Sequence, residues 1–195
     1  MSIRRITVVQ EPARAARALD AVAEAAAALE AELLGLFLED VELLHFAGLP
    51  FAREIGASSA QQRGLDVQTM ERRLRFQAEE ARRALAAAVE GKPLRWSFRV
   101  ERGSVPAQLR KALADADLVI LLGDHGERSL RRSAALLSAA EFSSASAPAL
   151  ERLAHALASD VYRVQLDTGE EAISKLLREL WRGAAGAKAE GTGRK

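Results

Sequence analysis

The chain has 195 residues, 49% of them apolar, with 28 basic and 27 acidic side chains and no cysteine. This length and composition are typical of one globular domain that stabilises itself by its own core. The lack of cysteine excludes disulfides, thiolate metal sites and cysteine nucleophiles, and a formal charge of +1 provides no general attraction to nucleic acid or an anionic membrane.

Alanine and arginine dominate the composition, with 40 and 23 residues. Alanine favours helices. The amino-terminal apolar stretch is too short for a signal peptide, and glutamates interrupt the longest alanine-rich stretch, residues 21–38. We therefore expect a cytoplasmic, helix-rich protein with neither a membrane nor a nucleic-acid partner.

The first half of the chain alternates strand and helix patterns. Residues 3–9 are β-branched and apolar before a proline, which predicts a strand. Apolar residues recur at helical spacing over 13–33, and 33–38 form a continuously apolar run that is typical of a buried parallel strand. Residues 41–65 contain several glycines and a proline, and they predict a long connection with a short helix.

The next elements follow the same alternation. A helix over 67–89 places one apolar stripe on a single face. Residues 94–100 alternate, which predicts a strand near an edge of the sheet. Ser104 is a candidate helix N-cap before a short helix to residue 116, and 118–122 read LVILL, which predicts a strand at the sheet centre. The stripe residues of the longer helix are Met70, Leu74, Ala78, Ala81, Leu85 and Ala88.

The last third has weaker patterns. Residues 129–140 have a helical composition, 143–148 resemble a flexible connection, and 150–157 predict another helix. Residues 161–166 predict a final strand and 173–180 a final helix. We expect one domain over 1–182 and a disordered tail over 183–195.

Alternating strands and helices predict a Rossmann-like, three-layer α/β/α fold around a parallel sheet with right-handed crossovers. Ligands of such sheets bind at the carboxyl ends of the strands, where the strand order reverses. The loops that follow residues 9, 38 and 122 meet in this crevice.

Five stretches resemble the universal stress protein family, a branch of the adenine-nucleotide α-hydrolase-like fold. They are IRRITVV, ALDAVAEAAAALEAELLGLFLED, VELLHFAGLPFAREI, WSFRVERGSVPAQLRKALADADLVILLG and the turn GDHG. The resemblance is clear over residues 3–126 and diverges over 127–182. It implies a five-stranded parallel sheet of order 3-2-1-4-5, frequent dimerisation through the last strand and, in one branch, ATP binding.

The ATP-binding branch has an Asp after the first strand, where this chain has Gln10. Its Gly-x-x-Gly fits Gly123 and Gly126, but the Gly and Ser or Thr that hold phosphates fall on Leu136 and Leu137, which have no hydroxyl. The turn amides and nearby arginines can still attract an anion; an ordinary strand-to-helix turn is the alternative. The candidate nucleotide or anion site is Gln10, Gly123, Asp124, His125, Gly126 and Arg128.

Two functions fit these residues. The first is a stress-response or regulatory protein that is expected to be non-catalytic, has an altered or lost ATP site and forms a homodimer. The alternative is an ATP-binding protein with slow ATPase or phosphotransfer activity. A further hypothesis interprets residues 150–180 as the start of a second, degenerate repeat.

Other chemistry has weaker patterns. The three histidines are far apart, so we expect no metal site. Glu39 and Asp40 form an acid pair without a visible nucleophile, and His45 is expected to be partly buried. The apolar loop at 49–51 is expected to fold back onto its own core; the alternatives are that it closes over the crevice or packs on a partner. Arginines at 72–75 and 82–83 alternate with glutamates, which indicates a solvated helix rather than a nucleic-acid surface.

Overall fold

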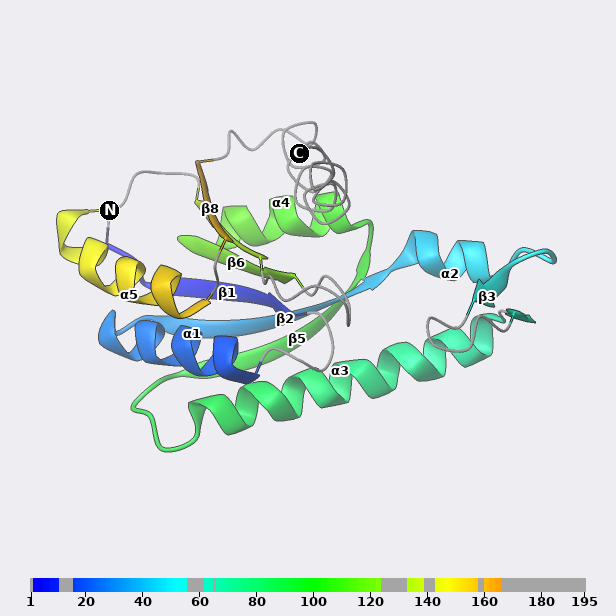
Figure 1. The fold of residues 1–195 in the computed structure, drawn as a ribbon, viewed down its shortest axis with the longest axis horizontal. Helices are drawn as coiled ribbons and strands as arrows, with labels where there is room; N and C mark the ends of the chain where they lie inside the picture. Colours follow the sequence, from blue (N-terminus) through cyan, green and yellow to red (C-terminus); the bar gives the residue numbers. More distant parts are fainter. Residues whose placement is uncertain are drawn as a thin grey trace, which may run out of the picture.

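A computed structural model describes residues 2–10, 16–55, 62–64, 66–123, 133–138, 143–157 and 160–165 (Figure 1). The strands are β1 Arg5–Gln10, β2 Glu32–Asp40, β3 Arg53–Ile55, β4 Gln62–Gly64, β5 Trp96–Gly103, β6 Leu118–Gly123, β7 Ser133–Ser138 and β8 Asp160–Gln165. The helices are α1 Ala16–Ala28, α2 Val41–Ala47, α3 Val67–Val89, α4 Val105–Asp115, the 3-10 turn η1 Ser144–Ser146 and α5 Ala147–Leu157.

Within the described residues, six strands form the main sheet, in the order β5-β2-β1-β6-β7-β8. The first four of these, β5, β2, β1 and β6, are mutually parallel, which confirms the predicted α/β class. They are the third, second, first and fourth of the strands predicted from the sequence, so their order is the expected 3-2-1-4. β7 is antiparallel to β6, and β8 is parallel to β7. The sheet therefore differs from the expected five parallel strands at the side beyond β6.

β7 corrects the helix that composition predicts over residues 129–140. Ser133–Ser138 reads SAALLS, in which alanine and leucine are good helix formers, yet residues 133–137 pair with β6. The neighbouring β6 is a long apolar strand whose edge would otherwise be open, and pairing with it overrides a weak local propensity. Local composition therefore failed where a tertiary contact determined the structure.

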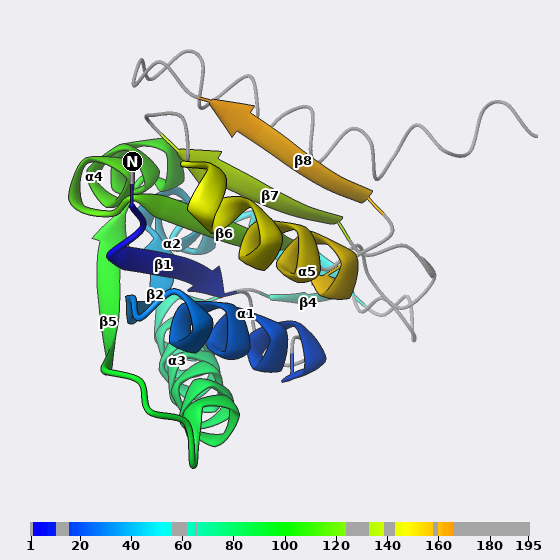
Figure 2. The ribbon, with the colours of Figure 1, turned by 90° about the vertical axis from the view of Figure 1, so that its left-hand side faces the viewer.

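Helices cover both faces of the sheet. Figures 1 and 2 show α1, α3 and α5 on one face and α4 on the other. The largest core cluster lies under α1, α3 and α5, a second lies between α2, β2 and the amino-terminal half of α3, and a third lies under α4. The six predicted stripe residues of α3 are all buried, which confirms the helical periodicity (Met70, Leu74, Ala78, Ala81, Leu85 and Ala88).

Gly35 marks the tightest packing in the sheet. A Cβ at this position of β2 would lie 2.4 Å from Cδ2 of Leu85 on α3 and 2.8 Å from Cδ2 of Phe98 on β5. No real Cβ fits at such distances, so a glycine is required for α3 to approach the strands this closely.

α2, β3, β4 and the amino-terminal part of α3 project beyond the carboxyl ends of the strands (Figure 1). The predicted short helix in this connection is confirmed, and the antiparallel pair β3 and β4 is an addition that three-residue strands do not reveal in sequence. The loop at residues 49–51 does not fold onto the core: Leu49 and Phe51 are 40% and 70% exposed.

Two further expectations are settled in the last third. Residues 143–148 are not a flexible connection, because η1 and the start of α5 occupy them. β8 lies in the main sheet beside β7 and not beside β6, so it is not the expected fifth parallel strand next to the fourth. The predicted helix at 173–180 and the tail at 183–195 lie outside the described residues.

Candidate functional site

The strand order reverses between β1 and β6. The chain proceeds from β1 outward through β2 to β5 and then returns to place β6 on the other side of β1. Ligands of open parallel sheets bind at the carboxyl ends of the strands that flank such a point. Here those ends are Gln10 on β1 and Gly123 on β6, two of the residues that the sequence predicts.

Gln10 is 3% exposed, although it is polar. Its Nε2 atom lies 3.3 Å from the position that a Cβ of Gly35 would occupy, so the amide extends over β2 toward α3. Nε2 has no hydrogen-bond partner among the described residues. A buried donor without a partner costs about 1–3 kcal/mol, which is the kind of group that a ligand acceptor satisfies.

Of the remaining predicted site residues, only Gly123 lies within the described part of the chain. Gly123 pairs with Ser133 of β7, while Asp124, His125, Gly126 and Arg128 lie outside the described residues. The structure therefore brings Gln10 and Gly123 to neighbouring strands and does not test the other four positions.

The two leucines at the expected phosphate positions are strand residues. In β7, Leu136 pairs with Ile120 and Leu137 with Val119 of β6. Both therefore lie part-way along the sheet, away from Gly123 at the carboxyl end of β6. Their backbone amides lie within a strand rather than at the start of a helix, where orphan amides attract phosphate.

The predicted acid pair Glu39 and Asp40 is occupied by structural contacts. Nε of Arg102 on β5 donates to Oε2 of Glu39 at 2.9 Å, and its guanidinium lies 3.6 Å from Oε1 of Glu71 on α3. Asp40 caps α2 by accepting from the backbone N–H of Glu42 at 2.9 Å. The contacts of Arg102 connect β2, β5 and α3, and the contact of Asp40 holds the start of α2.

Arg102 is the residue that sequence reasoning missed. Its pKa is raised by the hydrogen bond and charge of Glu39, with a smaller contribution from Glu71. Glu39 precedes it by 63 residues, so no local pattern links the two. Only the parallel register, in which Glu39 faces Arg102, places them together.

Histidines and acidic groups provide no metal site in the described part of the chain. His45 is exposed on α2, which corrects the expectation that it is partly buried, and His155 is exposed on α5. None of the described helices is long and apolar enough to cross a membrane.

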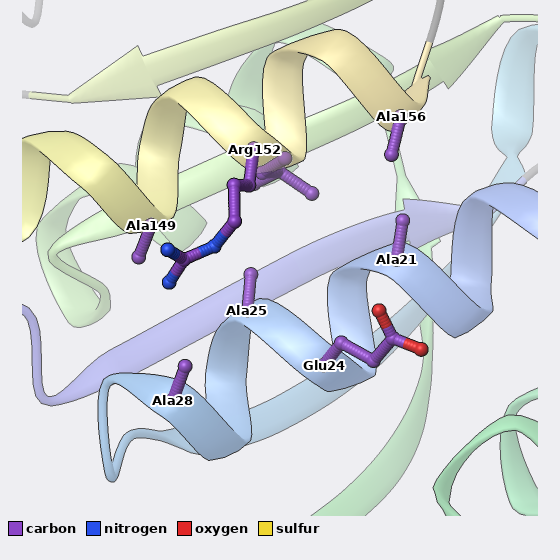
Figure 3. A pocket seen from close by; sticks show the side chains of 8 residues that line it. Ala21, Glu24, Ala25, Ala28, Ala149, Arg152 and Ala156 are labelled. Carbon is purple, nitrogen blue, oxygen red and sulfur yellow. The ribbon is translucent and has the colours of Figure 1, made fainter.

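A shallow groove of about 80 Å³ lies between α1 and α5 (Figure 3). Figure 3 shows alanines of the two helices facing each other across it, with Glu24 and Arg152 on its sides. These small side chains allow α1 and α5 to approach closely above the sheet. The groove lining is Ala21, Glu24, Ala25, Ala28, Ala149, Arg152, Leu153 and Ala156.

No protein-family model and no curated protein matches the chain. Among solved structures it resembles a universal stress protein family member from Burkholderia pseudomallei, with 19% identity and a TM-score of 0.43 over 85% of this chain and 98% of that one. It also resembles a universal stress protein in complex with cAMP (14%, TM-score 0.39, 87% and 100% covered). A third is a hypothetical protein solved as a test case of structural genomics (13%, TM-score 0.39, 84% and 96% covered).

Proposed function

We propose that this chain is a universal-stress-protein-like regulatory protein that acts by binding rather than by catalysis, and that its ATP site is altered or lost. The proposal joins the sequence resemblance over residues 3–126 to the chemistry of the strand ends. The observation that carries it is the place of Leu136 and Leu137 inside β7, paired with β6.

ATP recognition needs donors for three phosphates and a group that orients the nucleoside. In this chain the positions expected to supply the second set of phosphate donors belong to a strand, and the strand-end acid is replaced by Gln10. A neutral carboxamide cannot accept as strongly as a carboxylate from ribose hydroxyls, but it offers both a donor and an acceptor. The Gln10 carboxamide therefore favours a small ligand that presents an amide-like or base-like edge over a triphosphate.

The described residues near the carboxyl ends of the strands give no support for catalysis. Glu39 accepts from Arg102 and Asp40 caps α2, so neither acid has a proton-transfer partner there. The ATP-binding alternative depends instead on the turn that the sequence predicts after Gly123, where glycine amides and Arg128 would contact phosphate.

Calorimetric titration of the full chain with Mg·ATP, ADP, adenosine and cAMP tests the proposal. We expect no saturable binding of Mg·ATP below about 1 mM, a free energy of about −4.1 kcal/mol. Gln10→Asp, which introduces the acid of the ATP-binding branch, should strengthen adenosine binding more than it strengthens binding of triphosphate, because the added carboxylate accepts from the ribose of both ligands but repels the phosphates of one.

A matched variant, Gly126→Asp, separates the two functions. Mg·ATP binding tighter than about 100 µM, equivalent to about −5.5 kcal/mol, that this variant abolishes would contradict the proposal. Release of phosphate by the wild-type chain, absent in the same variant, would establish the enzymatic alternative. Circular dichroism melting of each variant checks that the fold is intact.

A further inference from the structure

β5 is an edge strand of unusual accessibility. It is eight residues long and terminates the sheet order in the described part of the chain (Figure 2). Trp96 and Val100 are 37% and 47% exposed on it, although both are large and apolar. Open strand edges present unpaired N–H and C=O groups that pair with another chain unless charge or proline prevents it.

The hydrogen-bond directions of β5 identify which groups point outward. The Arg95 carbonyl accepts from the Leu33 N–H at 2.9 Å, and the register with β2 continues without interruption to Gly103. Because backbone groups alternate sides along a strand, the residues whose N–H and C=O point away from β2 are Trp96, Phe98, Val100 and Arg102.

We propose that β5 pairs antiparallel with β5 of a second copy, about a two-fold axis at Val100. Val100 then exchanges both backbone hydrogen bonds with Val100 of the partner, and the pairing continues from Ser97 to Gly103. The two sheets join into one continuous sheet, and the surface is self-complementary, as a two-fold interface requires.

Charge selects this register. With the axis at Val100, Arg99 lies opposite Glu101 of the partner, in a non-hydrogen-bonded pair where side chains are closest. Moving the axis by one residue places Arg99 against Arg99 or Glu101 against Glu101, and like charges directly opposite are destabilising. The structure leaves Arg99 exposed and without an ion-pair partner among the described residues, whereas Glu101 has Lys111 at 3.3 Å.

The apolar groups of the edge fit the same axis. Val100 meets Val100 of the partner on the face covered by α3. Trp96 of each copy lies beside the end of the partner's β5, next to Gly103. Gly103 pairs with Asp40, after which α2 begins, and α2 has two exposed apolar residues, Leu43 and Phe46. This edge lies at the opposite side of the sheet from the last strand, where the family resemblance implies dimerisation. In this chain β7 already pairs with the far side of β6.

The chain's lack of cysteine permits a direct geometric test. Val100→Cys places two thiols across the axis, where paired Cα atoms lie about 5.5 Å apart, within disulfide range. Ser97→Cys is the matched control on the same exposed strand, because its two copies would be roughly 20 Å apart. We expect mild oxidation of the full chain to link the Val100→Cys copies rapidly and the Ser97→Cys copies slowly.

A charge swap tests the register in solution. Arg99→Glu should weaken the dimer about tenfold in sedimentation equilibrium, since two like-charge pairs replace two opposite-charge pairs, and Arg99→Glu with Glu101→Arg should restore it. Thermal melting verifies that each variant folds. The proposal is overturned if Val100→Cys links no faster than Ser97→Cys, if the wild-type chain stays monomeric up to high micromolar concentration, or if the double variant is as weak as Arg99→Glu.

Discussion

The centre of the sheet and its β5 edge differ in what their side chains contact. Ile6 and Val8 on β1 and Ile120 on β6 are fully buried, whereas Val100 on β5 is nearly half exposed. Central strands bury apolar side chains under helices on both faces and have little surface left for recognition. β1 and β6 therefore contribute their side chains to the core, whereas β5 has the open backbone edge and the exposed side chains with which a partner can pair.

A large loss of stability is expected at Gly35. Gly35→Val would drive its side chain into Leu85 and Phe98, with the Cβ alone 2.4 Å and 2.8 Å from their carbons. Overpacking of this kind typically costs about 1–3 kcal/mol and more when backbone must shift. Urea unfolding should show a loss at or above this range, and an unchanged midpoint would show that α3 is not held against β2 as described.

A matched pair of truncations measures the contrast itself. Ile120→Ala at the centre should cost about 2–5 kcal/mol because it leaves a cavity under the helices. Val100→Ala at the edge should change the stability of the monomer by no more than about 0.5 kcal/mol. Both are measured by urea unfolding at a low protein concentration. Equal losses would refute the division between centre and edge.

The Glu39–Arg102 pair joins β5 to β2, the neighbouring strand on the side of the sheet centre. We expect its loss to have an intermediate effect on stability. Glu39→Gln removes the charge that faces Arg102 at 2.9 Å and that raises the Arg102 pKa. We expect a fall of a few degrees in the melting temperature, together with faster hydrogen exchange in β5. Glu79→Gln, which alters an exposed pair at 3.9 Å, is the control and should change neither.

The smallest effect is expected at Asp66, the N-cap of α3, which belongs to neither region. Hydrogen bonds from Thr69 lower the Asp66 pKa below its ordinary value of 3.8. A lowered folded pKa means that the stabilising contribution is present above the unfolded value and disappears as the pH falls through the folded one. Asp66→Asn keeps a capping acceptor, so it should melt slightly below wild type at pH 7 and match it near pH 2. A constant difference across this range would contradict the assignment.

The sequence predicted the centre of this fold better than its margins. Long periodic or continuously apolar segments located α1, α3, β2 and β6, and alternation in residues 94–100 correctly placed β5 near an edge. Those patterns reflect burial by neighbouring elements, which the sequence records in its apolar spacing. The same signal is weak in SAALLS, and β7 was therefore missed because pairing with β6 outweighs its helical propensity.

The candidate site was predicted only in part, for a similar reason. Strand ends follow from strand patterns, so Gln10 and Gly123 were located, and the topology confirms that β1 and β6 are neighbours. The burial of Gln10 depends on the space beside Gly35, and the Glu39–Arg102 contact depends on the register of β2 with β5. Neither can be deduced from residues that are close in sequence.

Both proposals can be tested in one experiment, hydrogen exchange of the full chain followed by mass spectrometry at low and high protein concentration and with and without Mg·ATP. We expect protection in β5 to rise with protein concentration, while the ends of β1 and β6 do not respond to Mg·ATP. Both proposals would be contradicted if Mg·ATP increased protection at Gln10 and Gly123 and if protection in β5 did not change with protein concentration.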